Sequence, residues 1–323
     1  MRGAGLLLLA VLALALAPAG AQAKGPRTNS EEYKKSWGLE AIGARAAYAN
    51  GLTGKGVTVA IVDCGIAQAQ RDVLRNVSKR STDVVPGRGL PLTDPHGAYT
   101  AAPLAAALDG RGMVGVAYNA TVLAVRADVE GGLNGKCAFR PSDLARALDY
   151  AALQKARIVV LPLQHGKPLG APFEAALKRL VDSGAMVVIA AGNRQGPDPS
   201  WPAMYAVDPR YEGAIVVAGA TGYYGAITAW SNRAGHVAAW FVAAPGEWVL
   251  TNCRAKCDLV SGTSFSTSYV AGGLALMAEA WPGLSGRDLI ARLLSTARDA
   301  GEPGDDAIYG RGILDLARAF GAD

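Results

Sequence analysis

Histidine, cysteine and charged residues are scarce in this sequence. Its 323 residues include 3 histidines and 4 cysteines, and only 18% of them are charged. A zinc site would therefore have few ligands to draw on, and any catalytic histidine is one of three. The formal net charge is only +5, and no basic run is interleaved with aromatic residues. This pattern argues against nucleic acid as a partner.

Long apolar runs are absent after the N-terminus. The run over residues 6–17 is about a dozen residues long, short of the ~20 that span a bilayer. Arg2 precedes it, and residues 21–23 (Ala-Gln-Ala) form a small-x-small cleavage site. We expect a signal peptide over residues 1–23, with an uncleaved anchor as the alternative. The mature chain is then exported, periplasmic or extracellular, and has no stable membrane insertion.

The rest of the chain predicts a single domain. Residues 24–36 form a short N-terminal extension, and residues 37–320 contain neither an internal repeat nor a low-complexity linker. That length is enough for one large α/β domain with a substantial core. We expect this domain to be a monomer.

Strand and helix patterns alternate along this domain. Short apolar runs predict buried strands over residues 57–62, 122–125, 158–161, 186–190 and 215–217. Helical patterns lie around and between them, over residues 39–48, 144–153 and 173–181. Strands that are apolar on both faces and alternate with helices predict a doubly wound, mostly parallel sheet covered by helices on both faces. Ligand sites in such sheets lie at the carboxyl ends of the strands.

Polar residues lie where that rule places a site. Asp63 ends the first strand, and Asn193 follows the strand over residues 186–190. His96 precedes an alanine-rich helical stretch, residues 101–107. It is therefore a better candidate for a site residue than the other two histidines. Taken singly, each residue also fits an ordinary role, as a turn residue or a surface histidine.

Ser264 stands in a Gly-Thr-Ser turn that leads directly into the apolar stretch over residues 269–277. A helix that is apolar all round is a buried one. The first backbone N–H groups of a helix have no partner within it and lie at the positive end of its dipole. Such donors can hold a developing oxyanion beside Ser264, although a serine here also fits a simple helix cap.

The order Asp, His, Asn, Ser along one sheet edge resembles the subtilisin-like serine proteases, the subtilase or S8 peptidase family. The likeness extends over residues 37–320. Its motifs lie at residues 59–65, 96–97, 190–193, 244–246, 261–264 and 309–315. Residues 231–235 resemble the exported proteobacterial subtilases, including the protease domains of autotransporters.

The resemblance implies a role for each of the four residues. Ser264 would be the nucleophile, His96 its base, and Asp63 the group that orients His96. Asn193, with the backbone N–H of Ser264, would hold the oxyanion. The family then implies an exported serine endopeptidase that acts on peptide or protein substrates and needs no metal or other cofactor.

Residues 162–165 depart from the family pattern. Relatives usually carry Ser-Leu-Gly-Gly here, where the segment lines the first specificity pocket, whereas this chain has Pro-Leu-Gln-His. We expect the added bulk to narrow or slow substrate binding, with a neutral loop change as the alternative. The expected substrate-binding residues are Leu163, Gln164, His165, Ala191 and Gly192.

Two other functions compete with proteolysis. A non-catalytic subtilase fold that binds peptides or partners would explain the altered segment, although all four site residues are retained. A serine lipase or esterase is disfavoured because the chain lacks a Gly-x-Ser-x-Gly turn and has the wrong order of triad residues.

Four cysteines in an exported chain suggest two disulfides. Three pairings are possible, and we favour Cys253 with Cys257 and Cys64 with Cys137. The first pair would clamp a hairpin tip between the runs over residues 248–251 and 259–260. A zinc site is disfavoured because the spacing is unusual and no histidine is nearby.

Overall fold

The fold is known from a computed structural model, which describes residues 25–66, 71–88, 95–130, 137–253 and 256–322. The predicted signal peptide, residues 1–23, lies outside the described residues. Within the described part of the chain, no helix is both long and apolar enough to cross a membrane.

A seven-stranded sheet forms the centre of the domain, with the order β2-β3-β1-β4-β5-β6-β7. All neighbouring strands are parallel. The strands are β1 (Thr58–Asp63), β2 (Thr82–Asp83), β3 (Thr121–Arg126), β4 (Ile158–Leu161), β5 (Met186–Ala190), β6 (Ile215–Thr221) and β7 (Phe241–Pro245). Because the strand order reverses where β1 lies between β3 and β4, the crevice beyond their carboxyl ends is the expected place for a site.

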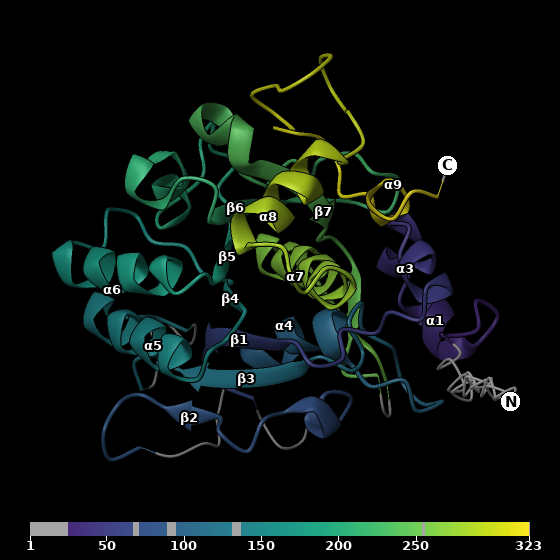
Figure 1. The fold of residues 1–323 in the computed structure, drawn as a ribbon, viewed down its shortest axis with the longest axis horizontal. Coiled ribbons are helices and arrows are strands. Elements are labelled where there is room, and N and C mark those ends of the chain that lie inside the picture. Colours follow the sequence, from purple (N-terminus) through teal and green to yellow (C-terminus); the bar gives the residue numbers. More distant parts are fainter. Residues whose placement is uncertain (1–24, 67–70, 89–94, 131–136, 254–255, 323) are drawn as a thin grey trace, which may run out of the picture.

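Helices cover both faces of this sheet, as predicted (Figure 1). One face is covered by α5 (Pro141–Leu153) and α6 (Ala171–Asp182), and the other by α4 (His96–Ala105), α7 (Thr263–Ala280) and α8 (Gly286–Ser295). Side chains alternate along β1, so that Val59 and Ile61 pack with α4 and α7 while Ala60 and Val62 pack with α5. The α/β architecture with a doubly wound parallel sheet is therefore confirmed.

Helix α7 runs through one of the two cores. Its residues from Thr263 to Ala278 are all buried, as the all-apolar pattern predicted. The helix packs against α4 and against strands β4 to β7. Its N-terminus therefore lies at a fixed place beside the carboxyl ends of the central strands.

Smaller elements complete the domain. Strands β8 (Val249–Thr251) and β9 (Asp258–Val260) form the predicted antiparallel hairpin, and Cys253 is bonded to Cys257 at its tip. The short helices are α1 (Glu31–Lys35), α2 (Gly38–Ala41), α3 (Arg45–Ala49) and α9 (Leu316–Ala319). The 3₁₀ helices are η1 (Leu74–Asn76), η2 (Ala203–Val207), η3 (Pro209–Tyr211) and η4 (Gly235–Trp240).

The described elements differ from the sequence-based expectation at several places. The helix expected over residues 39–48 is split into α2 and α3, because Gly43 has a φ of +66° and a Cβ there would lie 2.9 Å from the Ala317 Cβ. The apolar spacing remains, since Leu39 and Ile42 before the break and Ala47 after it are fully buried. Strands β2 and β7 and helix α8 were not predicted. The five residues of β7 end in a proline, which disfavours a strand.

Candidate active site

Asp63 and His96 come together at the carboxyl end of the sheet. Asp63 is the last residue of β1, and His96 is the first residue of α4. The Nδ1 atom of His96 lies 2.9 Å from both carboxylate oxygens of Asp63. The backbone N–H of Cys64 and the hydroxyl of Thr100 also donate to that carboxylate, at 2.7 and 3.2 Å. Asp63 is only 1% exposed, so its orientation is set by these protein partners.

Ser264 is the second residue of α7 and is 7% exposed. Its hydroxyl donates a hydrogen bond of 2.9 Å to the backbone carbonyl of Pro162, which follows β4. The backbone N–H of Ser264 lies in the first turn of α7, where N–H groups have no partner within the helix and the dipole is positive. This hydrogen bond joins the start of α7 to the segment after β4, which lies 102 residues earlier in the chain.

Asn193 lies beside the same helix start. Its side-chain oxygen accepts hydrogen bonds from the backbone N–H and the hydroxyl of Thr263, each at 2.9 Å. A backbone N–H can only donate, so the amide must turn its oxygen toward Thr263. The NH₂ group of Asn193 is consequently left as the donor for other partners, beside the residue that precedes Ser264.

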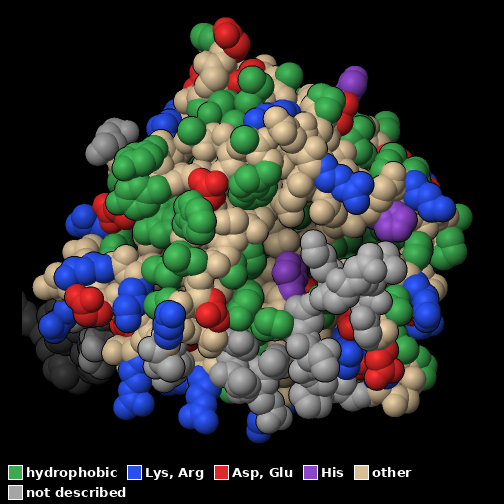
Figure 2. Space-filling view, turned by 180° about the vertical axis from the view of Figure 1, so that it is seen from behind, with side chains coloured by type: hydrophobic (Ala, Val, Ile, Leu, Met, Phe, Trp, Pro, Cys, Tyr) green, Lys and Arg blue, Asp and Glu red, His purple; other side chains and the backbone are tan. Residues whose placement is uncertain are grey.

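His96, Asn193 and Ser264 line one cavity of about 710 Å³, which we call the candidate cleft. Figure 2 looks onto the opposite side of the molecule from Figure 1 and shows a histidine (purple) near the centre of that face. The residues that line the candidate cleft are His96, Cys137, Ala138, Phe139, Leu144, Pro162, Leu163, Gln164, His165, Gly166, Ala190, Asn193, Arg194, Thr263 and Ser264. The ring of His96, the side chain of Asn193 and the hydroxyl of Ser264 therefore border the same space.

Three of the five residues expected to bind substrate line the candidate cleft, namely Leu163, Gln164 and His165. Ala191 and Gly192 are buried and are not among the lining residues. The Gln164 side chain reaches across to Asn193 and accepts a hydrogen bond of 3.1 Å from its backbone N–H. The side chain at position 164 therefore connects two walls of the candidate cleft.

Asn232 is a residue whose role the sequence did not reveal. It is 2% exposed, and its oxygen accepts from the backbone N–H groups of Arg194 and Gly196, at 2.9 and 3.0 Å. Its NH₂ group donates to the Ala191 carbonyl and the Ser200 hydroxyl, at 3.2 and 3.1 Å. Both ends of the amide are used to hold the turn that carries Asn193. The only sequence signal was its place in the stretch over residues 231–235.

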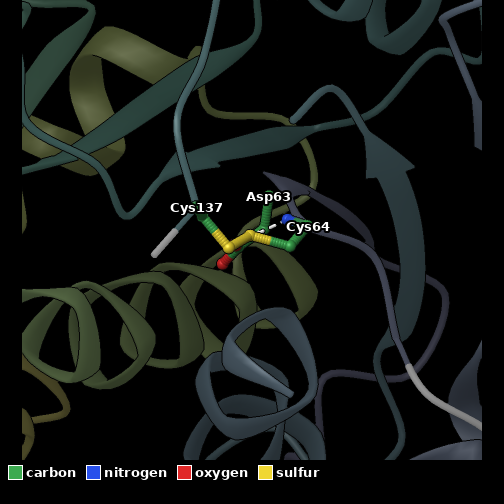
Figure 3. Close-up of side chains that lie close together, drawn as sticks. All are labelled: Asp63, Cys64 and Cys137. Atoms are coloured by element: carbon green, nitrogen blue, oxygen red, sulfur yellow. Dashed lines mark hydrogen bonds between the residues drawn. A yellow bond between two sulfur atoms is a disulfide. The ribbon is translucent and has the colours of Figure 1, made fainter. Parts of the chain in front are cut away.

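Cys64 is bonded to Cys137, the pairing favoured from the sequence. Figure 3 shows this disulfide directly beside Asp63. The three residues are the only group of metal-ligand type whose donor atoms lie within 4.8 Å of one another among the described residues. Both cysteines are used in the disulfide and offer no thiolate, so this group does not fit a metal ion.

Comparison with known proteins places the chain among proteases. Residues 54–312 match the model of the subtilase family. The chain is 31% identical over 290 residues to subtilisin BL of Lederbergia lenta, covering 88% of this chain and 97% of that one. It is 30% identical to an alkaline protease of Alkalihalobacillus alcalophilus, covering 88% and 69%.

A solved structure is also similar. The crystal structure of MycP1 with the N-terminal propeptide removed superposes with a TM-score of 0.71 at 27% identity. The match covers 88% of this chain and 96% of that one. The parallel sheet and its covering helices therefore have a counterpart in an experimental structure.

Proposed function

Because the chain belongs to the subtilase family, we propose that it is an exported serine endopeptidase with Asp63, His96 and Ser264 as its triad. Its substrates are peptides or proteins. In this proposal, residues 1–23 are the signal peptide, residues 24–36 a short extension, and residues 37–320 the peptidase domain.

The first step is activation of Ser264. The Asp63 carboxylate only accepts hydrogen bonds, so the neutral His96 ring carries its proton on Nδ1. The lone pair on Nε2 can then act as a base. The Ser264 hydroxyl exchanges its bond to the Pro162 carbonyl for one to His96. His96 takes the proton as Ser264 attacks the peptide carbonyl and returns it to the leaving amine as the C–N bond breaks. A water molecule, deprotonated by His96, then hydrolyses the ester on Ser264 and restores the free serine.

The oxyanion of the tetrahedral intermediate needs two donors. The NH₂ group of Asn193 supplies one, because its oxygen is held by Thr263. The backbone N–H of Ser264, in the first turn of α7, supplies the other. Donors fixed before the reaction stabilise the transition state without reorganisation, which is a large part of enzymatic rate enhancement.

The observation that carries the proposal is that His96, held by Asp63, shares the candidate cleft with Ser264 and Asn193. The alternative is a subtilase fold that binds peptides without cleaving them. The hydrogen bond that the Asn193 backbone N–H donates to the Gln164 side chain favours that alternative, because it ties together two walls of the candidate cleft.

Labelling with a fluorophosphonate probe distinguishes the two functions, since the probe reacts with activated serines whatever the substrate. We expect the mature protein to be labelled, and Ser264→Ala to lose both labelling and casein hydrolysis. Loss of the nucleophile lowers turnover by about 10⁶ in subtilisin. The matched control is Ser295→Ala, at an exposed serine on α8. A mature protein without labelling would favour the binding function instead.

A further inference from the structure

The ionisable side chains that line the candidate cleft are all basic. They are His96, His165 and Arg194, and no aspartate or glutamate lines the cavity where the structure describes it. Asp63 lies behind His96 and is 1% exposed, so its charge is engaged by the triad. A peptide that enters the candidate cleft therefore meets basic groups and hydrogen-bond donors.

Arg194 directly follows Asn193 in the sequence. Along the chain it is therefore the charged residue closest to the proposed oxyanion donor. Its backbone is fixed, since its N–H donates to the buried oxygen of Asn232 at 2.9 Å. Its side chain is exposed, and no carboxylate of the described residues forms an ion pair with it. The guanidinium is available for a carboxylate brought by a ligand.

Gln164 adds donors on the opposite wall. Its oxygen accepts from the backbone N–H of Asn193 at 3.1 Å, which fixes the direction of the amide. The NH₂ group is consequently the end that remains for a ligand. A backbone or carboxylate oxygen can accept from this group, whereas an ammonium group cannot.

We propose, on the basis of the proposed function, that the protease prefers substrates with an acidic side chain at the residue before the cleaved bond. The carbonyl of that residue would become the oxyanion held by Asn193. Gln164 is bonded to Asn193, Arg194 follows it, and all three line the candidate cleft, so the side chain of that residue would meet both. Glutamate or aspartate would pair with Arg194 and accept from Gln164. Lysine or arginine at the same position would be repelled.

The test compares fluorogenic peptides that differ only at this residue, which is Glu, Gln or Lys. We expect kcat/KM for the Glu peptide to exceed that for the Gln peptide by about 5-fold, the upper range of one exposed ion pair. The Lys peptide should be the slowest. The Glu-to-Gln ratio should fall as salt is raised from about 0.05 to about 1 M, since salt screens exposed charges.

Two variants test the residue assigned to this preference. Arg194→Gln should lower the Glu-to-Gln ratio to near one, and Arg194→Glu should make the Lys peptide faster than the Glu peptide. The control Lys55→Gln removes an equal charge just before the amino end of β1, away from the candidate cleft, and should leave the ratio unchanged. Because each ratio is measured within one enzyme, a partly folded preparation does not alter it.

Gln164→Gly with His165→Gly tests the other wall. This double variant should speed hydrolysis of peptides with bulky apolar residues before the cleaved bond, and reduce the preference for Glu over Gln. A parent enzyme that is labelled by the fluorophosphonate probe but cleaves the Gln and Lys peptides as fast as the Glu peptide would overturn the acidic preference alone. An enzyme that neither reacts with the probe nor cleaves any peptide would overturn the proposed function as well.

Discussion

Two aspartate–histidine pairs in the described part of the chain have nearly the same length and differ in everything around them. In the first, Nδ1 of His96 lies 2.9 Å from Asp63, and the side chains are 32% and 1% exposed. In the second, Nδ1 of His236 lies 2.8 Å from Asp198, and the side chains are 80% and 34% exposed. The distance between Nδ1 and the carboxylate therefore does not distinguish the two pairs.

The surroundings separate the two pairs. Asp63 is held by donors from the end of β1 and from α4 as well as by His96, and the ring of His96 faces the candidate cleft that contains Ser264. Asp198 instead accepts from both the ring and the backbone N–H of His236, at 2.8 Å each, and so ties two surface turns together. An imidazole held by a carboxylate acts as a base in catalysis only where its other nitrogen can reach a proton of a reacting group.

Matched substitutions give the largest expected contrast. Asp63→Asn should lower kcat by about 10⁴, the loss measured for the same change in another serine protease, whereas Asp198→Asn should leave kcat unchanged. The Cys64 N–H requires an oxygen, so the amide that replaces the carboxylate would turn its NH₂ group toward His96 and force the wrong ring tautomer. Hydrolysis of a peptide substrate measures both variants. Equal losses would show that the buried pair has no special role.

The second comparison concerns two residues that form hydrogen bonds with the loop over residues 191–200. Asn232 is buried beneath this loop, and His236 is exposed beside it. Asn232→Ala should lower kcat by about 10² with little change in KM, near the 10²–10³ that loss of an oxyanion donor costs. His236→Ala should change neither constant.

Asn232→Asp is the informative intermediate. It keeps the oxygen that accepts from Arg194 and Gly196 but loses the NH₂ group that donates to Ala191 and Ser200. Its kcat should therefore lie between that of Asn232→Ala and that of the parent. An Asn232→Ala enzyme with normal kcat and raised KM would mean that this residue shapes the candidate cleft rather than positioning Asn193.

The smallest expected effect is on pH dependence. The hydrogen bond from the His236 backbone N–H lowers the pKa of Asp198, with partial burial opposing it and the ring of His236 reinforcing it. A lowered pKa stabilises the folded state above the unfolded value of about 3.9, and this stabilisation is lost as the pH falls through the folded pKa.

Asp198→Asn should therefore lower the melting temperature at pH 6 by no more than about 2 °C, as for a weak surface pair. The melting temperatures of the parent and the variant should converge only as the pH falls below the unfolded pKa of about 3.9 and through the lowered folded pKa of Asp198. A constant difference across this range would show that the charge of Asp198 is not responsible.

The fold was largely predictable because its signals are local and strong. The runs at residues 158–161 and 186–190 became β4 and β5 with unchanged bounds, since buried parallel strands are apolar on both faces. The break at Gly43 was not predictable, because it depends on close approach of Ala317 from the other end of the chain. The same holds for β7, which is a strand because β6 pairs with it.

The site was predictable to the extent that it follows from strand ends. Asp63 and Asn193 end or follow parallel strands, and His96 and Ser264 begin or nearly begin helices, so topology alone brings them to one edge. The bonds of Gln164 to Asn193 and of Asn232 to Arg194 were not predictable. They depend on side-chain conformations across 29 and 38 residues of sequence separation, and no periodic pattern encodes those.

The disulfide between Cys64 and Cys137 has a consequence for how the protein must be handled. It fastens the backbone beside Asp63 to residues 137–139, which line the candidate cleft, across a sequence separation of 73 residues. Thiol reductants added as a routine precaution would release that wall from the strand carrying the aspartate. Activity measured in such buffers would describe a different cleft, so purification and assay belong in non-reducing solution, preferably after expression in an oxidising compartment.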